Sequence, residues 1–138
     1  MQKPILLFLV DDDADDCDIF ASMIADIFPE ISCSFARDGI HALEILDGDP
    51  SFVPNFIFID INMPRMNGIQ LLTEIKKIPR LQAVPVWMYS TTAMPAIVEQ
   101  CASLGAAGFV RKNFNLDNLK AELKEILLKG LPEMVHKP

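Results

Sequence analysis

The sequence predicts a single α/β domain in which a five-stranded parallel sheet is covered by helices on both faces. Short apolar runs of strand length alternate with stretches of helical period, and this alternation occurs five times along the chain. No linker or low-complexity segment separates the five units, which argues for one sheet rather than two domains. Right-handed crossover connections then limit the possible topologies to a few.

Five apolar runs predict the strands. The first, Ile5–Val10, has the composition of a buried strand and ends at three consecutive aspartates. The second, 32–36, is half polar, whereas the third, Phe56–Ile59, is fully apolar and is followed at once by Asp60. The last two runs predict strands over 84–89 and 108–111.

The stretches of helical period predict five helices, and several have recognisable ends. Pro29 ends the first helix because proline cannot continue one, and Asp38 is a candidate N-cap of the second. Pro95 falls in the first turn of the fourth helix, where proline is tolerated, and Gly105 follows its last turn. The predicted ranges are 14–28, 39–46, 69–77, a stretch after Thr92 that reaches 104, and 115–128.

Composition narrows the class of protein. The 138 residues suit one domain, over 1–130, with a short C-terminal tail over 131–138. A net charge of −7 disfavours direct binding to nucleic acid or to an anionic membrane. Three cysteines without a CxxC pair support neither a disulfide framework nor a zinc site, and reduced thiols fit a cytoplasmic protein. The chain shows neither a secretory signal nor an apolar run long enough to span a membrane.

Polar residues that could do chemistry follow the ends of four predicted strands. Ligands of open α/β sheets bind outside the carboxyl ends of the strands, so these residues are expected to share one site. Clustered carboxylates repel one another unless a cation relieves them, and oxygen ligands without histidine or cysteine favour Mg²⁺. A lysine and a hydroxyl beside them suit a phosphoryl group, and an aspartate can be its nucleophile. The residues are Asp11, Asp12 and Asp13, Asp60, Ser90 and Thr91, and Lys112.

Four segments of the chain carry a family resemblance. They are Leu9-Val10-Asp11-Asp12, Asp60-Ile61-Asn62-Met63-Pro64-Arg65-Met66-Asn67-Gly68, Pro85-Val86-Trp87-Met88-Tyr89-Ser90 and Gly108-Phe109-Val110-Arg111-Lys112. These segments resemble the receiver domains of two-component response regulators, and the resemblance covers about 4–128. It implies a flavodoxin-like strand order, 2-1-3-4-5. It also implies that Asp60 is the phosphoacceptor and that Ser90 and Lys112 contact the phosphoryl oxygens.

The same resemblance implies a metal set and a switch. Mg²⁺ would be held by the carboxylates of Asp12 and Asp60, by the backbone carbonyl of Asn62, and by Asp11 mostly through water. Phe109 would be the aromatic switch partner of Ser90. Asp13, Asp15, Asp16 and Asp18 are expected to form a solvated helix face without a ligand role.

The implied function is that of a stand-alone phosphoacceptor signalling domain, not an enzyme with its own substrate. A sensor histidine kinase or phosphotransfer protein would phosphorylate Asp60, and this would change the affinity for a downstream protein. Later hydrolysis of the acyl phosphate would reset the switch. The protein would be a monomer or a phosphorylation-dependent dimer. Neither the cognate kinase nor the downstream target can be read from the sequence.

Two departures from the family pattern and several alternatives accompany this interpretation. Asn113 stands where the family usually has proline in a cis peptide, so we expect a trans Lys112–Asn113 bond. Ser90 stands where the family often has threonine, and this change keeps the hydroxyl. Asp11 or Asp12 could instead cap the first helix, and Ser90 the fourth.

Two other functions compete with the receiver hypothesis. A haloacid-dehalogenase-like phosphatase would use Asp11 as its nucleophile, but Asp15 is not the threonine or valine that this family needs and a cap domain is lacking. A receiver-like module that is never phosphorylated is the second alternative, and the presence of Asp11, Asp12 and Asp60 together argues against it. An EF-hand is rejected because the acidic run lacks the glycine and glutamate that its loop requires.

Overall fold

The computed structural model describes residues 4–113 and 115–131, and it confirms the predicted fold class. Five parallel strands pair in the order β2-β1-β3-β4-β5, the flavodoxin-like order that the resemblance implied. The strands are β1 (Ile5–Val10), β2 (Ile31–Ala36), β3 (Phe56–Ile59), β4 (Val86–Ser90) and β5 (Gly108–Arg111). The helices are α1 (Ala14–Ile27), α2 (Gly39–Gly48), α3 (Gly68–Ile75), the 3₁₀ turn η1 (Pro79–Leu81), α4 (Pro95–Ser103) and α5 (Leu116–Gly130).

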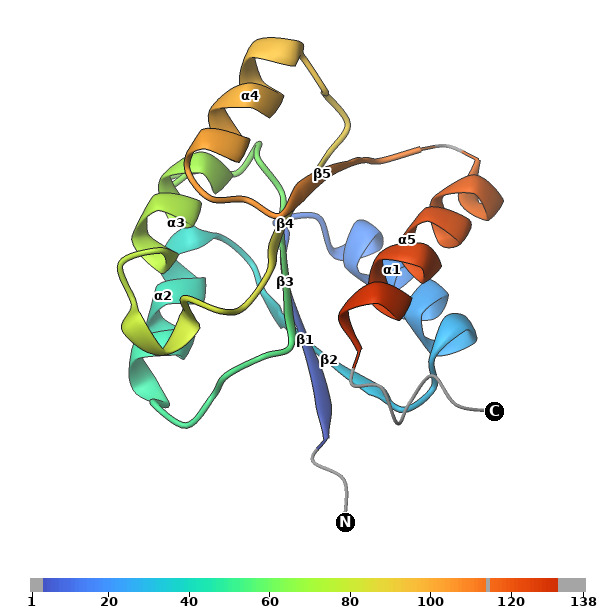
Figure 1. The fold of residues 1–138 in the computed structure, drawn as a ribbon, viewed down its shortest axis with the longest axis horizontal. Helices are drawn as coiled ribbons and strands as arrows, with labels where there is room; N and C mark the ends of the chain where they lie inside the picture. Colours follow the sequence, from blue (N-terminus) through green and yellow to red (C-terminus); the bar gives the residue numbers. More distant parts are fainter. Residues whose placement is uncertain (1–3, 114, 132–138) are drawn as a thin grey trace.

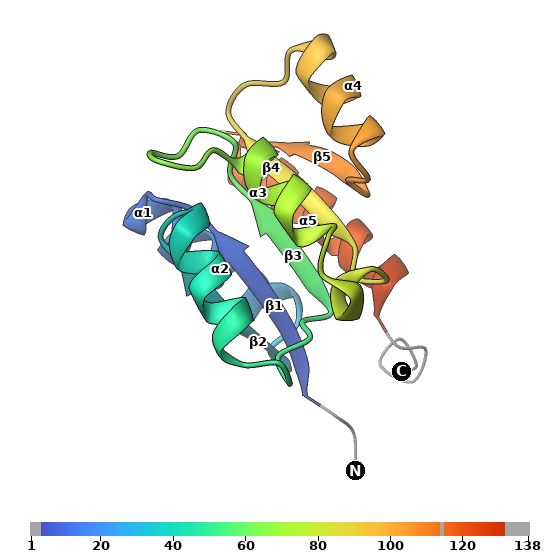
Figure 2. The same cartoon turned by 90° about the vertical axis from the view of Figure 1, so that its left-hand side faces the viewer.

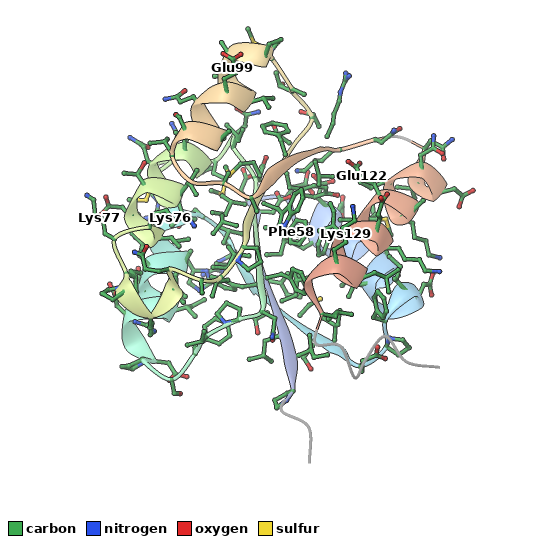
Figure 3. All side chains as sticks on the ribbon, viewed as in Figure 1. Phe58, Lys76, Lys77, Glu99, Glu122 and Lys129 are labelled. Atoms are coloured by element: carbon green, nitrogen blue, oxygen red, sulfur yellow. The ribbon has the colours of Figure 1, made fainter. Side chains whose placement is uncertain are left out.

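The helices cover the sheet from both sides (Figures 1 and 2): α1 and α5 lie on one face and α2, α3 and α4 on the other. Successive strand residues point to opposite faces, so each central strand contributes to two cores. On β3, Phe58 packs with α1 and α5, whereas Ile57 and Ile59 pack on the other side. In Figure 3 Phe58 lies in the interior, while Lys77 and Glu99 point outward from the helices.

Side-chain caps fix where four of the helices begin. The Asp13 carboxylate accepts hydrogen bonds from two N–H groups of α1, and Asp38 accepts one from His41 N–H at 2.8 Å. Asn67 and Gln70 form a reciprocal capping box at α3, and Asn115 caps α5. Helix α4 begins at Pro95 without a side-chain cap. The predicted cap at Asp38 is therefore confirmed, whereas the alternative of a cap at Asp11 or Asp12 is wrong.

The ends of the chain differ slightly from the predicted bounds. Helix α5 runs two residues beyond the predicted 128, to Gly130, and Leu131 packs against the α1–α5 core with 6% exposure. Apart from Leu131, the predicted tail over 131–138 lies outside the described residues. All three cysteines are free thiols. Over 4–113 and 115–131, no helix combines the length and apolar composition needed to cross a bilayer.

Candidate functional site

The sheet brings the carboxyl ends of its central strands to one edge. Backbone hydrogen bonds align these ends: Asp60 N–H donates to the Val10 carbonyl at 2.9 Å, and Lys112 N–H donates to the Ser90 carbonyl at 2.8 Å. Asp60 thus lies beside the end of β1, and Lys112 lies beside the end of β4. The residues predicted from the strand ends meet at this edge because the five strands are parallel and in register.

Three carboxylates form the centre of the site. Asp11, Asp12 and Asp60 each offer an oxygen, and these oxygens all lie within 4.8 Å of one another. Asp11 and Asp60 are buried, at 2% and 6% exposure, while Asp12 is exposed. The cluster is therefore buried at Asp11 and Asp60 and accessible to solvent at Asp12.

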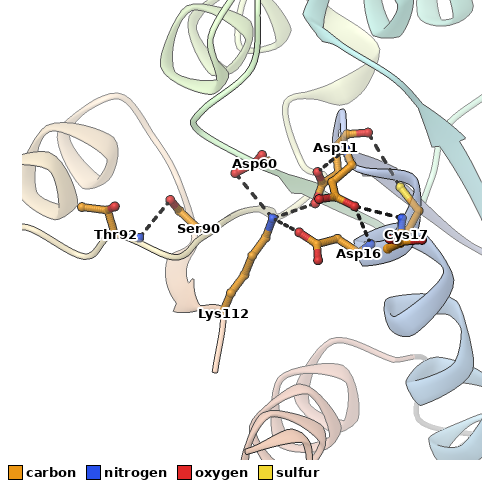
Figure 4. Close-up of polar contacts among 9 residues, drawn as sticks. Asp11, Asp16, Cys17, Asp60, Ser90, Thr92 and Lys112 are labelled. Carbon is orange, nitrogen blue, oxygen red and sulfur yellow. Dashed lines mark hydrogen bonds and ion pairs between the residues drawn. The ribbon is translucent and has the colours of Figure 1, made fainter. Parts of the chain in front are cut away.

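Lys112 follows the last residue of β5, and its side chain reaches into the site (Figure 4). That side chain is only 12% exposed. Its ammonium donates hydrogen bonds of 2.8 Å to Asp11 Oδ2 and 2.8 Å to Asp16 Oδ2. It lies 3.7 Å from Asp60 Oδ1 and 5.1 Å from the centre of the Tyr89 ring. The lysine is thus a fixed positive charge beside the carboxylate cluster.

Burial and crowding change the proton affinities of the cluster. Burial raises the pKa of Asp60 to about 7, which the charge of Lys112 opposes and the neighbouring Asp11 charge reinforces. Burial also raises the pKa of Asp11, against its hydrogen bond from Lys112. Burial would lower the pKa of Lys112, but its hydrogen bonds to Asp11 and Asp16 raise it. Burial and the repulsion between the carboxylates therefore disfavour the charged forms of Asp11 and Asp60, and Lys112 offsets this only in part.

A pH-dependent stability follows for Asp60 in metal-free buffer. The folded pKa of Asp60, about 7, lies well above the ordinary pKa of an aspartate, which is about 4. Asp60 therefore contributes stability that is fully present below about pH 4 and is lost as the pH rises through 7. Asp60→Asn removes the group that titrates. The free energy of unfolding of the variant, relative to that of wild type, should therefore be about 2–4 kcal/mol higher at pH 8 than at pH 4.5. Urea unfolding in EDTA at both pH values measures this; an equal gain at both would contradict the raised pKa.

Ser90 and Phe109 lie on the same side of the sheet. On β4, Met88 belongs to the core beneath α4, and Ser90 follows it by two residues, so both side chains share that face. Phe109 on β5 is partly buried against the same core. The Ser90 side chain is buried, and its oxygen accepts a long hydrogen bond of 3.3 Å from Thr92 N–H. The position is thus compatible with movement of the hydroxyl.

The loop after Asp60 is packed tightly against the site. Gly68 N–H donates to the Ile61 carbonyl at 2.9 Å. A Cβ on Gly68 would lie 2.3 Å from the Asp60 carbonyl oxygen, so only glycine allows α3 to begin this close to the Asp60 backbone.

The structure corrects one expectation and excludes two alternatives about individual residues. Asp16 is not merely part of a solvated helix face, because it accepts a hydrogen bond from Lys112. Asp13, rather than Asp11 or Asp12, caps α1. Ser90 is not an N-cap, since α4 begins only at Pro95 with Met94 before it. The expected trans Lys112–Asn113 bond is confirmed, because no peptide bond over 4–113 and 115–131 is cis.

This arrangement fits a hard divalent cation. Three carboxylate oxygens within 4.8 Å of one another are the donor type that Mg²⁺ prefers, and one of the three residues opens to solvent. A lysine ammonium contacts this cluster, and Figure 4 shows the Ser90 hydroxyl at the end of the neighbouring strand. Both are groups that stabilise phosphoryl oxygens.

Comparisons with known proteins agree with this geometry. Residues 7–124 match the family model described as the response regulator receiver domain. The chain is 30% identical to the two-component response regulator ARR17 of Arabidopsis thaliana, over 87% of this chain and 83% of that protein.

Two solved structures give the same fold. The phosphorylated cyanobacterial phytochrome response regulator RcpA superimposes with a TM-score of 0.83, at 26% identity, over 93% of this chain and 94% of that one. The Mn²⁺-bound form of the response regulator Rcp1 superimposes with a TM-score of 0.75, at 26% identity, over 90% of this chain and 92% of that one.

Proposed function

The chain belongs to the response regulator receiver domain family, and on this premise we propose that Asp60 accepts a phosphoryl group from phosphohistidine and so switches the binding of a partner protein. The observation that carries this proposal is the convergence of three carboxylates and a lysine ammonium on one edge of the sheet. The phosphoryl donor is a sensor histidine kinase or a phosphotransfer protein.

Asp60 is the proposed nucleophile. It directly follows β3 in the middle of the sheet, where its carboxylate is one of the three in the cluster and its Oδ1 lies 3.7 Å from the Lys112 ammonium. A carboxylate oxygen forms the new O–P bond while the N–P bond of the phosphohistidine breaks, and the imidazole leaves with that electron pair. Asp11 is the less suitable nucleophile because its oxygens already accept hydrogen bonds from Lys112 and from Asp13 N–H.

The charge that develops on the phosphoryl oxygens requires fixed positive partners. Lys112 supplies one of them, and the hydroxyl of Ser90 supplies a donor. Asp12 and Asp60 would hold Mg²⁺ with the backbone carbonyl of Asn62, and Asp11 would contact it mostly through water; this ion would neutralise charge on the transferred group. The Mn²⁺-bound state of the similar regulator Rcp1 supports a divalent ion.

The switch is proposed to involve Ser90 and Phe109. A phosphoryl group on Asp60 attracts the Ser90 hydroxyl, whose oxygen accepts only a long hydrogen bond of 3.3 Å from Thr92 N–H. Movement of Ser90 leaves space for Phe109, which lies on the same face of the sheet and is only partly buried. The surface formed by α4, β5 and α5 then changes, and partner affinity changes with it to the extent that the partner distinguishes the two states.

The expected setting is cytoplasmic, where the three thiols stay reduced. The net charge of −7 argues against direct contact with nucleic acid, so the output is proposed to be a protein partner. The oligomeric state is proposed to be a monomer or a dimer that forms on phosphorylation, and the acyl phosphate is proposed to hydrolyse within the same site.

Phosphorylation should depend on a divalent ion and on Asp12. EDTA is expected to abolish phosphorylation by phosphoramidate. Asp12→Asn should raise the Mg²⁺ concentration for half-maximal rate at least tenfold, because one of the two carboxylates proposed to bind the ion directly is lost. Thermal unfolding across a Mg²⁺ titration gives an independent measure, since an ion that binds the folded state stabilises it.

Asp47→Asn is the matched control for this experiment. Asp47 is exposed on α2, outside the carboxylate cluster, and its loss removes the same charge from the chain. An Asp12→Asn protein whose Mg²⁺ dependence equals that of Asp47→Asn would contradict the assigned metal site.

A further inference from the structure

The ammonium of Lys112 is held by two carboxylates of different character. Asp11 belongs both to this contact and to the carboxylate cluster, whereas Asp16 has no ligand atom in that cluster. The two hydrogen bonds from Lys112 have the same length, 2.8 Å. The hydrogen bond from Lys112 to Asp16 therefore does not involve a carboxylate that would also have to bind a metal ion.

The two contacts leave one donor of the ammonium free. A lysine ammonium has three N–H groups, and Asp11 and Asp16 each accept one. At 3.7 Å, Asp60 Oδ1 is too far for a hydrogen bond but close enough for charge attraction. Phosphoryl oxygens attached to Asp60 would lie on this side, where the third donor can meet them.

Asp16 is itself anchored. It lies in the first turn of α1, where the Asp13 side chain accepts hydrogen bonds from Asp15 N–H at 2.9 Å and from Asp16 N–H at 3.1 Å. Asp13 N–H in turn donates to Asp11 Oδ1 at 3.0 Å. The backbone that carries Asp16 is thus tied to the end of β1, within the site.

Lys112 has room to leave without this anchor. A cavity of about 330 Å³ lies beside it, with Asp16 and Lys112 themselves in its lining together with Thr91, Asn113 and Leu116. A lysine has many rotamers, and ordering it in one of them costs conformational entropy. A contact that opposes movement into this cavity keeps the ammonium at the reacting carboxylate.

We propose that Asp16 is a positioning residue, which holds the Lys112 ammonium towards Asp60 during phosphoryl transfer. This inference rests on the proposed phosphorylation of Asp60. Asp16 touches neither the phosphoryl group nor the ion and acts through Lys112 alone. Its effect on the rate should therefore vanish when Lys112 is removed.

The test compares Asp16→Asn with Asp15→Asn in the whole chain, with phosphoramidate as donor and Mg²⁺ present. Both aspartates lie in the first turn of α1, so both changes remove the same charge near the same helix end. Asp16→Asn is expected to slow phosphorylation about tenfold and Asp15→Asn less than twofold. Asp16→Glu should recover part of the rate, because its carboxylate can still reach the lysine.

Three results would overturn the proposal. One is an equal rate for Asp16→Asn and Asp15→Asn. Another is a Mg²⁺ affinity for Asp16→Asn weakened more than about twofold, measured by thermal unfolding, which would indicate an effect through the ion. The third is a further tenfold loss from Asp16→Asn in a Lys112→Met background, where no additional effect is expected.

A measurement without donor or ion separates this proposal from the proposed function. Urea unfolding in EDTA of wild type, Asp16→Asn, Lys112→Met and the double variant gives the coupling between the two side chains. The expected coupling is at least fivefold in the unfolding equilibrium constant. If wild type is not phosphorylated but coupling is found, the proposed function fails and the contact stands; additive effects refute the positioning contact itself.

Discussion

Asp60→Asn is expected to abolish phosphorylation. The amide is close in size to the carboxylate, but it lacks the anionic oxygen that forms the new bond to phosphorus. The protein should remain folded, because the substitution removes a buried charge whose pKa is raised to about 7. Intact-mass measurement after incubation with phosphoramidate and Mg²⁺ should show the mass of one added phosphoryl group in wild type and none in the variant.

The Asp47→Asn protein serves again as the control, since it loses the same charge at an exposed position on α2. It should gain the phosphoryl mass as wild type does. If Asp60→Asn were modified at the wild-type rate, the nucleophile would have to be sought elsewhere in the cluster, and the proposed mechanism would be wrong.

Lys112→Met is expected to slow phosphorylation about 100-fold or more. Loss of one preorganised donor to developing negative charge typically reduces a rate by about 10²–10³. The methionine keeps an apolar side chain of similar length, so the packing beside Tyr89 should survive. Quenched time courses with phosphoramidate measure the rate, and the variant should still bind Mg²⁺ because the three carboxylates remain.

The same substitution should destabilise the metal-free fold. Lys112 is the cation nearest to Asp11 and Asp60, and removing one member of a buried ion pair costs about 3 kcal/mol. Lys120→Met is a suitable control, because the Lys120–Asp26 pair is exposed and such pairs contribute little. A Lys112→Met protein that reacts like Lys120→Met would refute the role assigned to the lysine.

The sequence predicted the parts of the site that depend on strand ends alone. Asp11, Asp12, Asp60 and Lys112 each follow a predicted strand at once, and parallel strands bring their carboxyl ends to one edge. The alternation of strands and helices established the layers, and the resemblance supplied the strand order. These features are local or follow from general rules of how strands are connected, so the sequence pattern was sufficient to predict them.

The sequence could not predict the contact between Asp16 and Lys112. The two residues are 96 positions apart, and their meeting depends on where the fold places the first turn of α1 relative to the end of β5. Asp16 looks like its acidic neighbours in sequence, because acidic residues are common in the first turn of any helix. The only available signal was its place in the first turn after Asp11, which marks its side chain as near the site without naming a partner.

The sequence pattern also could not predict some of the helix caps and element boundaries. Ser90 was a reasonable N-cap candidate by residue type, but the strand retains it and α4 begins five residues later at Pro95. Leu131 looked like part of a tail, yet it is buried at 6% exposure against the α1–α5 core. Both differences arise from tertiary packing, which decides where an element stops when local preferences are weak.

Reductive trapping of the phosphorylated chain tests the central claim without any substitution. Borohydride reduces an aspartyl phosphate to the alcohol with release of phosphate, so the modified residue becomes homoserine and can be located by peptide mass spectrometry. Homoserine at position 60 is the predicted result. Homoserine at position 11 would instead favour a phosphatase-like nucleophile, and a chain with no homoserine after treatment with donor and Mg²⁺ would contradict phosphorylation altogether.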